Sequence, residues 1–306
     1  MSTSVRTRPI WMEEPTPPEK VLKAGAIVLV LLAVLFPLYV VVLTSISTQS
    51  SVAEAGGLVI VPHGITFGAY TDLFSGGVVT RSVIVSTGVT LVGTVLSVAV
   101  TVMAAYGLSR PNSFGHRPLL FIILLTFLFG PGIIPTYLLV QSLGLIDNFA
   151  SLILPGAVAA FNVVVVRSFF MNSIPQDLID SARLDGASEF RILREIVLPL
   201  SKAVTAVIAL FYGVGYWNAF FNALLYLNDN GKWPLQLVLR AYVLQGQPIP
   251  GVNSVQQAAA NSLTGAAPTL AIKMAVITLA VIPVLIVYPF VQRHFTKGVI
   301  IGAVKG

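Results

Sequence analysis

The stretch from residue 82 to residue 109, SVIVSTGVTLVGTVLSVAVTVMAAYGLS, contains no charged side chain. A helix needs about 20 predominantly apolar residues to cross the hydrocarbon core of a bilayer. Residues 203–228 form a second uncharged stretch of comparable length. The two stretches are long enough for one crossing each, so the sequence predicts helices that span a membrane more than once.

The overall composition agrees with a lipid environment. Of the 306 residues, 56% are hydrophobic and only 10% are charged, and the mean hydropathy is +0.87. A soluble domain carries about 25% charged residues. The net charge of +6 would suit a nucleic-acid ligand, but the basic residues lie between the apolar stretches, which indicates membrane topology instead. Because the chain has no cysteine, zinc–thiolate sites, redox CxxC motifs and disulfides are excluded.

We predict an all-α polytopic fold with six transmembrane helices, because a backbone segment in lipid must satisfy its own hydrogen bonds. The predicted spans are residues 22–44, 83–108, 118–141, 149–170, 203–226 and 272–292. They divide the chain into an N-terminal tail (1–21), a transmembrane domain (22–292) and a C-terminal tail (293–306). Gly130-Pro131-Gly132 and Pro135 interrupt the third span, as a kink packed on its neighbours or as a break that lines a pathway.

The basic residues predict the orientation. With the N-terminus inside, 14 lysines and arginines lie on the cytoplasmic side and 4 lie outside, which satisfies the positive-inside rule and places both termini in the cytoplasm. The cytoplasmic set is Arg6, Arg8, Lys20, Lys23, Arg110, Arg117, Arg167, Arg183, Arg191, Arg194, Lys202, Arg293, Lys297 and Lys305; the outer set is Arg81, Lys232, Arg240 and Lys273.

Two long loops then face outward, residues 45–82 and 227–271, the second with a short helix expected near 254–264. Loops of this length are uncommon unless they are functional or disordered. They either receive an external partner or serve as connectors.

The sequence lacks the motifs of several kinds of binding site and catalytic site. The one Gly-Lys pair, Gly231-Lys232, is followed by Trp233, so no phosphate-binding loop of the G-x4-G-K-[ST] type exists. The three histidines lie far apart in the sequence, and no acidic residue falls inside a predicted span, which argues against ion coupling. We expect no catalytic residue, no metal and no bound cofactor in this chain.

Residues 167–202, RSFFMNSIPQDLIDSARLDGASEFRILREIVLPLSK, differ from the other loops by their dense charges. They predict two short helices on the cytoplasmic membrane face. The first begins at a capping box formed by Ser173 and Gln176 and ends at Gly186; the second covers about 188–196. Leu178, Ser181, Ala182 and Asp185 share one face of the first helix, and most are small enough for another backbone to approach. The alternative is a solvated amphipathic connector.

The order Asp180-Ser181-Ala182, Gly186, Ile196 and Leu198-Pro199 resembles the EAA motif of ABC importer permeases. Asp for Glu at 180 and Ser for Ala at 181 preserve charge sign and size. The resemblance implies that segment 173–200 holds a coupling helix that docks on an ATPase subunit. It assigns this role to Asp180, Ser181, Ala182, Asp185, Gly186, Ala187, Ile196, Leu198 and Pro199. Ser188 lies outside the fixed positions, so Ser188→Ala is expected to be neutral.

The resemblance extends from about residue 80 to the end of the chain. Four stretches are similar to carbohydrate permeases of the maltose type: Pro131 to Pro135, Ile146-Asp147-Asn148, Trp217-Asn218 and the tail from Tyr288 to Gly298. Residues 299–306 are similar to the group that handles oligosaccharides or polysaccharide fragments. This implies a non-catalytic subunit of a bacterial inner-membrane importer. Its expected partners are a second homologous permease, two cytosolic ATPase subunits that bind ATP and magnesium, an extracytoplasmic solute-binding protein and a carbohydrate.

The fifth predicted span is rich in aromatic residues and carries Asn218 and Asn222 one helical turn apart. Aromatic faces combined with amides suit a sugar, so Tyr216, Trp217, Asn218 and Asn222 are candidates for the substrate pathway. Core packing and lipid-facing belts use the same residue types. Two other functions stay open: an importer permease for a non-sugar solute such as a peptide or phosphate, and a membrane scaffold or enzyme.

Overall fold

The computed structural model describes residues 16–75, 77–110, 113–245 and 269–303. Within these ranges every regular element is a helix, apart from one isolated bridge between Ser47 and Ile65. The prediction of an all-helical chain is therefore confirmed for the described residues. The three longest helices are α1 (Pro17–Ser45), α4 (Val78–Ser109) and α16 (Thr269–Ala303).

The helices provide between three and six candidate membrane spans. Pro17–Ser45, Val78–Ser109 and Leu270–Val287 are each long and apolar enough to cross a bilayer. Three bent pairs raise the number to six if each pair is one span: α5 (His116–Leu128) with α6 (Ile133–Ser142), Ala150–Gly156 with α8 (Ala160–Ser173), and Glu189–Leu200 with α12 (Lys202–Trp217).

The third predicted span is broken rather than kinked. Helices α5 and α6 differ in direction by 118°, and Gly132 between them has φ +84°. Proline at 131 removes a backbone donor, and a positive φ is available to glycine without steric cost. The interpretation of this region as a packed kink is therefore wrong.

The fourth predicted span is also discontinuous. Helix α7 (Ala150–Ile153) and the 3-10 turn η1 (Leu154–Gly156) precede α8 after a bend of 51°. Pro155 lies in that turn, where it cannot donate a backbone hydrogen bond. The expectation of one uninterrupted helix over 149–170 is wrong.

The fifth predicted span divides in two. Helix α12 ends at Trp217, and α13 (Phe220–Tyr226) begins after a two-residue break. The last helical hydrogen bond of α12 runs from the Asn218 N–H to the Val214 carbonyl at 3.1 Å, and the Asn218 side chain donates to the same carbonyl at 3.0 Å. The next two N–H groups leave the helical pattern, because Ala219 donates to the Tyr216 carbonyl and Phe220 donates to the Asn218 carbonyl. Asn218 and Asn222 therefore do not occupy successive turns of one helix, contrary to the sequence expectation.

Helices also extend into both predicted tails. Helix α1 begins at Pro17, where proline suits the first helical position, and the Glu19 carboxylate accepts from the Thr16 N–H at 2.9 Å. Helix α16 continues to Ala303, well past the predicted end of the sixth span at 292. The short helix expected near 254–264 lies outside the described residues.

The loop between α1 and α4 is folded against the end of α1. It contains α2 (Gln49–Glu54) and α3 (Gly68–Ser75). Val59 is fully buried, and its N–H donates to Thr44 Oγ1 at 2.9 Å. The loop is therefore an ordered cap on α1 over its described residues.

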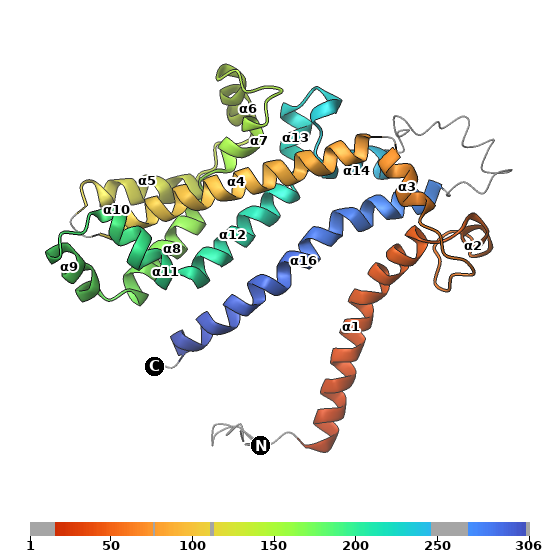
Figure 1. Ribbon diagram of the computed structural model, residues 1–306, viewed down its shortest axis with the longest axis horizontal. Coiled ribbons are helices and arrows are strands. Elements are labelled where there is room, and N and C mark those ends of the chain that lie inside the picture. The colour runs from red at the N-terminus through yellow and green to blue at the C-terminus, as the bar shows by residue number, and fades with distance from the viewer. Residues whose placement is uncertain (1–15, 76, 111–112, 246–268, 304–306) are drawn as a thin grey trace.

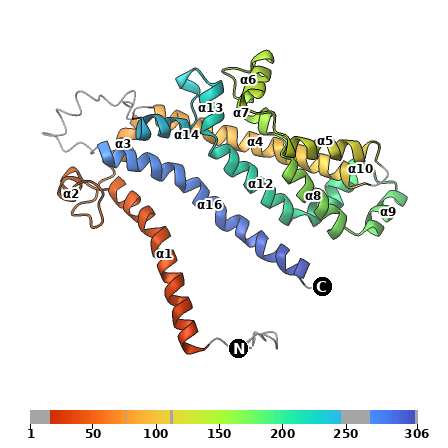
Figure 2. The ribbon, with the colours of Figure 1, turned by 180° about the vertical axis from the view of Figure 1, so that it is seen from behind.

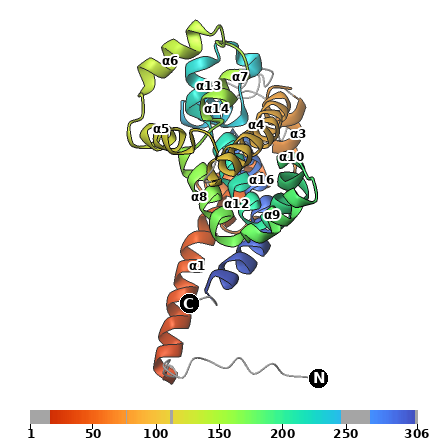
Figure 3. The same cartoon turned by 90° about the vertical axis from the view of Figure 1, so that its left-hand side faces the viewer.

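Helices α4, α8, α12 and α16 pack side by side and form the core. The short helices α9 (Gln176–Leu184) and α10 (Glu189–Ile192) lie at one end of α4, and α3 and α14 (Leu235–Leu239) lie at the other (Figure 1). Helix α1 packs against α16 near one end and then diverges from the bundle in all three views (Figures 2 and 3). Only 6% of its most apolar window is buried, which leaves its surface for lipid or another subunit.

Candidate functional site

The segment that resembles a coupling helix forms three consecutive pieces. Helix α9 (Gln176–Leu184) is followed by α10 (Glu189–Ile192), and the chain continues through a π turn, η2 (Leu193–Val197), into α11 (Leu198–Leu200). Gly186 lies between α9 and α10 with φ +80°. This is the left-handed conformation that its position at the end of a helix predicts.

Helix α9 is attached to the bundle along one side only. Ile179 is buried in a core cluster with α4, α8 and α12, and Ala182 and Ala187 pack against that cluster. Leu178, Ser181 and Asp185 are exposed. Three of the four residues predicted to share a face are thus accessible, and Leu184 beside them is 90% exposed.

Three details of the segment differ from the sequence prediction. Helix α9 begins after Pro175, without a side-chain cap, while Ser173 is the last residue of α8, so the predicted capping box is wrong. The second helix runs on through Leu200. Ser188 caps α10 by accepting from the Arg191 N–H at 3.4 Å, so Ser188→Ala removes a cap worth about 1 kcal/mol and is unsuitable as a neutral control.

Polar side chains connect the segment to the end of α4. The Tyr106 hydroxyl of α4 donates to Glu189 Oε2, and Arg183 Nε donates to Glu189 Oε1 at 2.8 Å. Arg183 also pairs with Asp180 at 3.3 Å. Glu189 therefore links α9, α10 and α4, and it was not among the predicted site residues.

A second connection runs beside the first. Arg110, which follows α4, donates to Gln176 Oε1 at 3.3 Å, and Gln176 donates to Asp180 Oδ1 at 3.2 Å. The Arg110 guanidinium also lies 4.5 Å from the centre of the Tyr106 ring. Helix α4 has 32 residues, which is about 48 Å at 1.5 Å per residue, so it can cross the bilayer and still reach the coupling segment.

Acidification is expected to loosen this connection. The Arg183 guanidinium, followed by the Tyr106 hydroxyl, holds the pKa of Glu189 below its usual 4.5. The resulting stabilisation is present above the unfolded-state pKa and is lost as the pH falls through the folded-state pKa. Glu189 is about half exposed, so solvent screening keeps the effect small. Hydrogen exchange of the α9 amides, corrected for its intrinsic pH dependence, should show a step in acid. Glu189→Gln should abolish the step, and Glu195→Gln should retain it.

Two tyrosines of α12 satisfy the backbone at the break in the fourth span. The Ala159 N–H donates to the Tyr212 hydroxyl at 3.0 Å, and the Tyr216 hydroxyl donates to the Ile153 carbonyl at 3.1 Å. Each hydroxyl also contacts a hydroxyl of α4: Thr101 pairs with Tyr212 and Ser97 pairs with Tyr216, both at 2.7 Å. We call these four side chains the tyrosine ladder. It holds α4, α12 and the broken span together.

The structure places the candidate pathway residues in different environments. Tyr216 belongs to the tyrosine ladder. Trp217 is buried and donates from Nε1 to the Ala280 carbonyl of α16 at 2.8 Å. Asn218 is exposed and Asn222 is half-exposed. The four residues therefore do not form one lining, and their role in a pathway stays a prediction.

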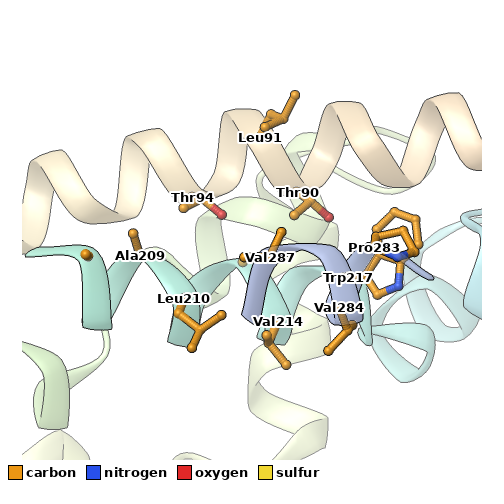
Figure 4. A pocket seen from close by; sticks show the side chains of 12 residues that line it. Thr90, Leu91, Thr94, Ala209, Leu210, Val214, Trp217, Pro283, Val284 and Val287 are labelled. Atoms are coloured by element: carbon orange, nitrogen blue, oxygen red, sulfur yellow. The ribbon is translucent and has the colours of Figure 1, made fainter. Parts of the chain in front are cut away.

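A cavity of about 410 Å³ lies between α4, α12 and α16. Its walls are almost entirely apolar, and Trp217 is part of them (Figure 4). The Thr90 and Thr94 hydroxyls are buried and have no hydrogen-bond partner within the described part of the chain. An apolar space of this kind does not suit a hydroxyl-rich sugar.

A more polar group of side chains lies at the break between α12 and α13. Gln236 donates to Asn218 Oδ1 at 3.4 Å. The guanidinium of Arg240, at the start of the π turn η4 (Arg240–Leu244), lies 5.0 Å from the centre of the Phe220 ring. Phe220 and Phe221 are both partly exposed and meet edge to face.

The loops at the same end of the molecule are joined by Asp147, which has φ +57°. Its carboxylate accepts from the Asn228 and Asp229 N–H groups at 2.6 and 2.9 Å, and Lys232 donates to its carbonyl at 2.8 Å. These backbone donors, that of Asp229 first, lower the pKa of Asp147. The loop before α7 is thereby fixed to the loop after α13.

Sequence reasoning missed Glu189, Arg240 and the contacts of the tyrosine ladder as contributors to these sites, and it marked Asp147 only as part of the Ile146-Asp147-Asn148 resemblance, without a role. One signal for the ladder was available. Ser97 and Thr101 are four residues apart in an apolar helix, and so are Tyr212 and Tyr216. Residues at this spacing share a helix face, which would have suggested two matching polar stripes.

The described residues form helices, several of which are long and apolar enough to span a membrane, with a pair of short helices fixed across one end. This arrangement fits a membrane component of a transport system. Residues 64–301 match the family described as binding-protein-dependent transport system inner membrane components, and the chain belongs to this family.

Relatives and a solved structure agree with this assignment. The chain is 42% identical over 282 residues to the polygalacturonan/rhamnogalacturonan transport system permease protein YtcP of Bacillus subtilis, covering 92% of this chain and 96% of that protein. It is 31% identical over 277 residues to the arabinooligosaccharides transport system permease protein AraQ of the same organism, covering 89% and 91%. A chain from the crystal structure of a bacterial ABC transporter that imports the acidic polysaccharide alginate superimposes with a TM-score of 0.83 at 31% identity, covering 93% of this chain and all of that one.

Proposed function

We propose that this chain is the permease subunit of a bacterial ABC importer for oligosaccharides and forms half of the translocation pathway. Family membership, together with the carbohydrate substrates named for its relatives, supports the proposal. The observation that carries it is the arrangement of α9 and α10 across one end of the bundle, with Gly186 between them at φ +80°.

In this proposal the exposed side of α9 docks on a cytosolic ATPase subunit. The coupling residues are the nine predicted from the motif, Asp180, Ser181, Ala182, Asp185, Gly186, Ala187, Ile196, Leu198 and Pro199. Asp180 already pairs with Arg183, so its first role is to hold α9 in shape. ATP and magnesium are held by the two ATPase subunits, and the motion they produce reaches α4 through Glu189 and Tyr106.

The proposed complex also contains a second, homologous permease and an extracytoplasmic binding protein that delivers the sugar to the outer loops. Docking α9 on a cytosolic ATPase requires that end of the bundle to lie inside the cell. The opposite end, with Asp147 and α14, then faces outward. The exposed surface of α1 meets lipid or the sister subunit.

We further propose six spans in the bacterial inner membrane with both termini in the cytoplasm. The transmembrane domain is residues 22–292, the tails are 1–21 and 293–306, and the coupling segment is 173–200. The fifth span is α12 together with α13. Glu189–Leu200, at 87° to α12, carries four charged side chains and lies along the membrane surface.

Cysteine labelling tests the orientation, because the chain has no cysteine of its own. A membrane-impermeant thiol reagent should label Asn230→Cys in intact cells, since this exposed residue lies in the outer loop. Phe114 is fully exposed in the loop between α4 and α5. Phe114→Cys should be labelled only after the cells are permeabilised. Labelling of Phe114→Cys in intact cells would refute the six-span topology.

Purification and uptake test the function. The chain extracted gently from its host should carry an ATPase and a second permease, and the pure chain should show no ATPase activity. Cells or proteoliposomes with the whole system should take up oligosaccharides. Uptake of peptides or phosphate instead would favour an importer permease for a non-sugar solute. ATPase activity of the pure chain, or extraction of the chain without any ATPase or second permease, would contradict the proposal.

A further inference from the structure

The side chains at the break between α12 and α13 include a cation that has no carboxylate partner among the described residues. Of the four basic residues predicted outside, Lys232 pairs with Asp229 and donates to the Asp147 carbonyl. Arg240 makes no ion pair in the described part of the chain and lies over the face of Phe220. Both Arg240 and Phe220 are only partly buried.

We propose that Arg240, Phe220, Asn218 and Gln236 form a subsite for one carboxylate-bearing ring of an acidic oligosaccharide. This inference deepens the proposed function and rests on it. Arg240 would bind the carboxylate, Phe220 would meet the C–H face of the sugar ring, and the two amides would bind hydroxyl groups.

The chemistry of each side chain suits this ligand. A guanidinium presents a planar fork of donors that matches the two oxygens of a carboxylate. The aromatic ring beneath Arg240 keeps that plane oriented, since a cation over an aromatic face is electrostatically favoured. The amides of Asn218 and Gln236 can both donate and accept, as hydroxyl groups require. A neutral sugar would leave the cation without its partner.

The backbone around the four residues of the proposed subsite is irregular, and hydrogen bonds hold it in place. Asn218 lies at the gap between α12 and α13, and non-helical backbone at membrane depth is tolerated where it lines a cavity or is buried in protein. Arg240 begins a π turn, in which its carbonyl accepts from the Gln245 N–H at 3.2 Å; such turns are frequent at functional sites. Helix α14, which carries Gln236, is held to α4 by the buried hydrogen bond from the Leu235 N–H to Ser86 Oγ at 2.7 Å.

Two of the three similar proteins named above point to the same substrate class, whereas AraQ is named for arabinooligosaccharides, which carry no carboxylate. Polygalacturonan is a polymer of a uronic acid, and alginate is named as an acidic polysaccharide. Every ring of such a fragment carries a carboxylate, so a permease of this kind must pass one negative charge per sugar through a low-dielectric environment. A positioned arginine offsets part of that desolvation cost.

The test compares a charged substrate with its uncharged counterpart. Proteoliposomes that hold the whole importer, with excess binding protein, take up trigalacturonate or its methyl ester, and the binding of both sugars to the complex without binding protein is measured in parallel. Arg240→Gln should lower both uptake and binding of trigalacturonate by about tenfold or more, because it removes a charge-assisted hydrogen bond. The uptake and binding of the methyl ester should change little. Arg240→Lys should recover much of the loss, and Arg81→Gln, which removes another outer charge, should have no effect.

The outcomes separate this inference from the function on which it rests. Equal losses for acid and ester, or no loss in Arg240→Gln, would overturn the uronate subsite while leaving sugar import intact. A loss that appears only in vesicles with anionic phospholipid would assign Arg240 to a lipid phosphate and would also overturn it. A wild-type importer that carries neutral oligosaccharides but neither of these two sugars would overturn the inference alone. A wild-type importer that carries no oligosaccharide at all would instead refute the proposed function.

Discussion

A Gly186→Val chain is expected to insert in the membrane at normal levels and to take up no oligosaccharide. Gly186 has φ +80°, a conformation that costs a residue with a Cβ about 1–2 kcal/mol. Apart from its two chain neighbours, no atom of the described residues lies within 4 Å of the position of an added Cβ, so the penalty comes from the backbone and not from a clash. The valine chain should therefore turn α9 away from its docking position while the spans stay unchanged. Uptake, and ATP hydrolysis stimulated by the binding protein, measure the loss.

The matched control is Gly115→Val. Gly115 also has a positive φ, +70°, lies at the same end of the molecule, and would bring its Cβ no closer than 3.8 Å to Leu119. Valine at position 115 has a similar backbone cost, but this position lies outside the proposed coupling segment, so uptake should persist. Asparagine tolerates a positive φ better than valine does, so Gly186→Asn should retain part of the uptake that Gly186→Val loses. Wild-type uptake by normally expressed Gly186→Val would show that the segment is only a connector.

The largest loss of stability is expected from Gly93→Val. A Cβ at Gly93 would lie 2.8 Å from Cε2 of Tyr216, closer than real contacts allow. The ring cannot move aside without loss, because its hydroxyl is bonded to Ser97 and to the Ile153 carbonyl. Overpacking costs about 1–3 kcal/mol, and a buried polar group left without a partner costs about 1–3 kcal/mol more. Thermal unfolding of the purified protein in detergent should show a fall of the midpoint by several degrees or more.

The same helix provides the control. Gly88 is exposed on α4 with nothing within 4 Å of an added Cβ, so Gly88→Ala should leave stability unchanged or raise it through helix propensity. A double-mutant cycle tests the cause: Gly93→Ala should cost much less in a Tyr216→Leu background. If the two substitutions act additively, the contact between Gly93 and Tyr216 is not what limits the substitution.

The long apolar helices could be predicted from the sequence, but the breaks in them could not all be predicted. Uncharged stretches such as 82–109 marked the helices because lipid excludes charge over a whole crossing. The break at Gly130–Gly132 carried a visible proline and glycine signal, although its angle of 118° did not follow from that signal. The break at Asn218 had no such mark, because no proline or glycine lies between Tyr216 and Asn222, and the sequence does not show that the Ala219 and Phe220 N–H groups leave the helical pattern there.

The motif indicated which segment resembles a coupling helix, and the positive φ of Gly186 followed from its place at the end of the first short helix; the coupling role itself stays a prediction. The contacts that hold the segment could not be anticipated. Tyr106 and Glu189 are 83 positions apart, and a single sequence gives no indication that two such residues meet. The same limit applies to Arg240 and Phe220, which meet only because the chain turns back between α13 and α14.

The tyrosine ladder has a consequence for the order of biosynthesis. Its partners on α4 and α12 are separated by 111 and 119 residues, so α4 leaves the translocon before Tyr212 and Tyr216 have been synthesised. Ser97 and Thr101 can meanwhile bond back to carbonyls of their own helix, which lets α4 insert alone. Each span then becomes stable in lipid first, and the helices associate afterwards. The ladder contacts can form only after α12 has been inserted. A nascent chain that stops before residue 212 should therefore be inserted in the membrane but still be cleaved by quality-control proteases.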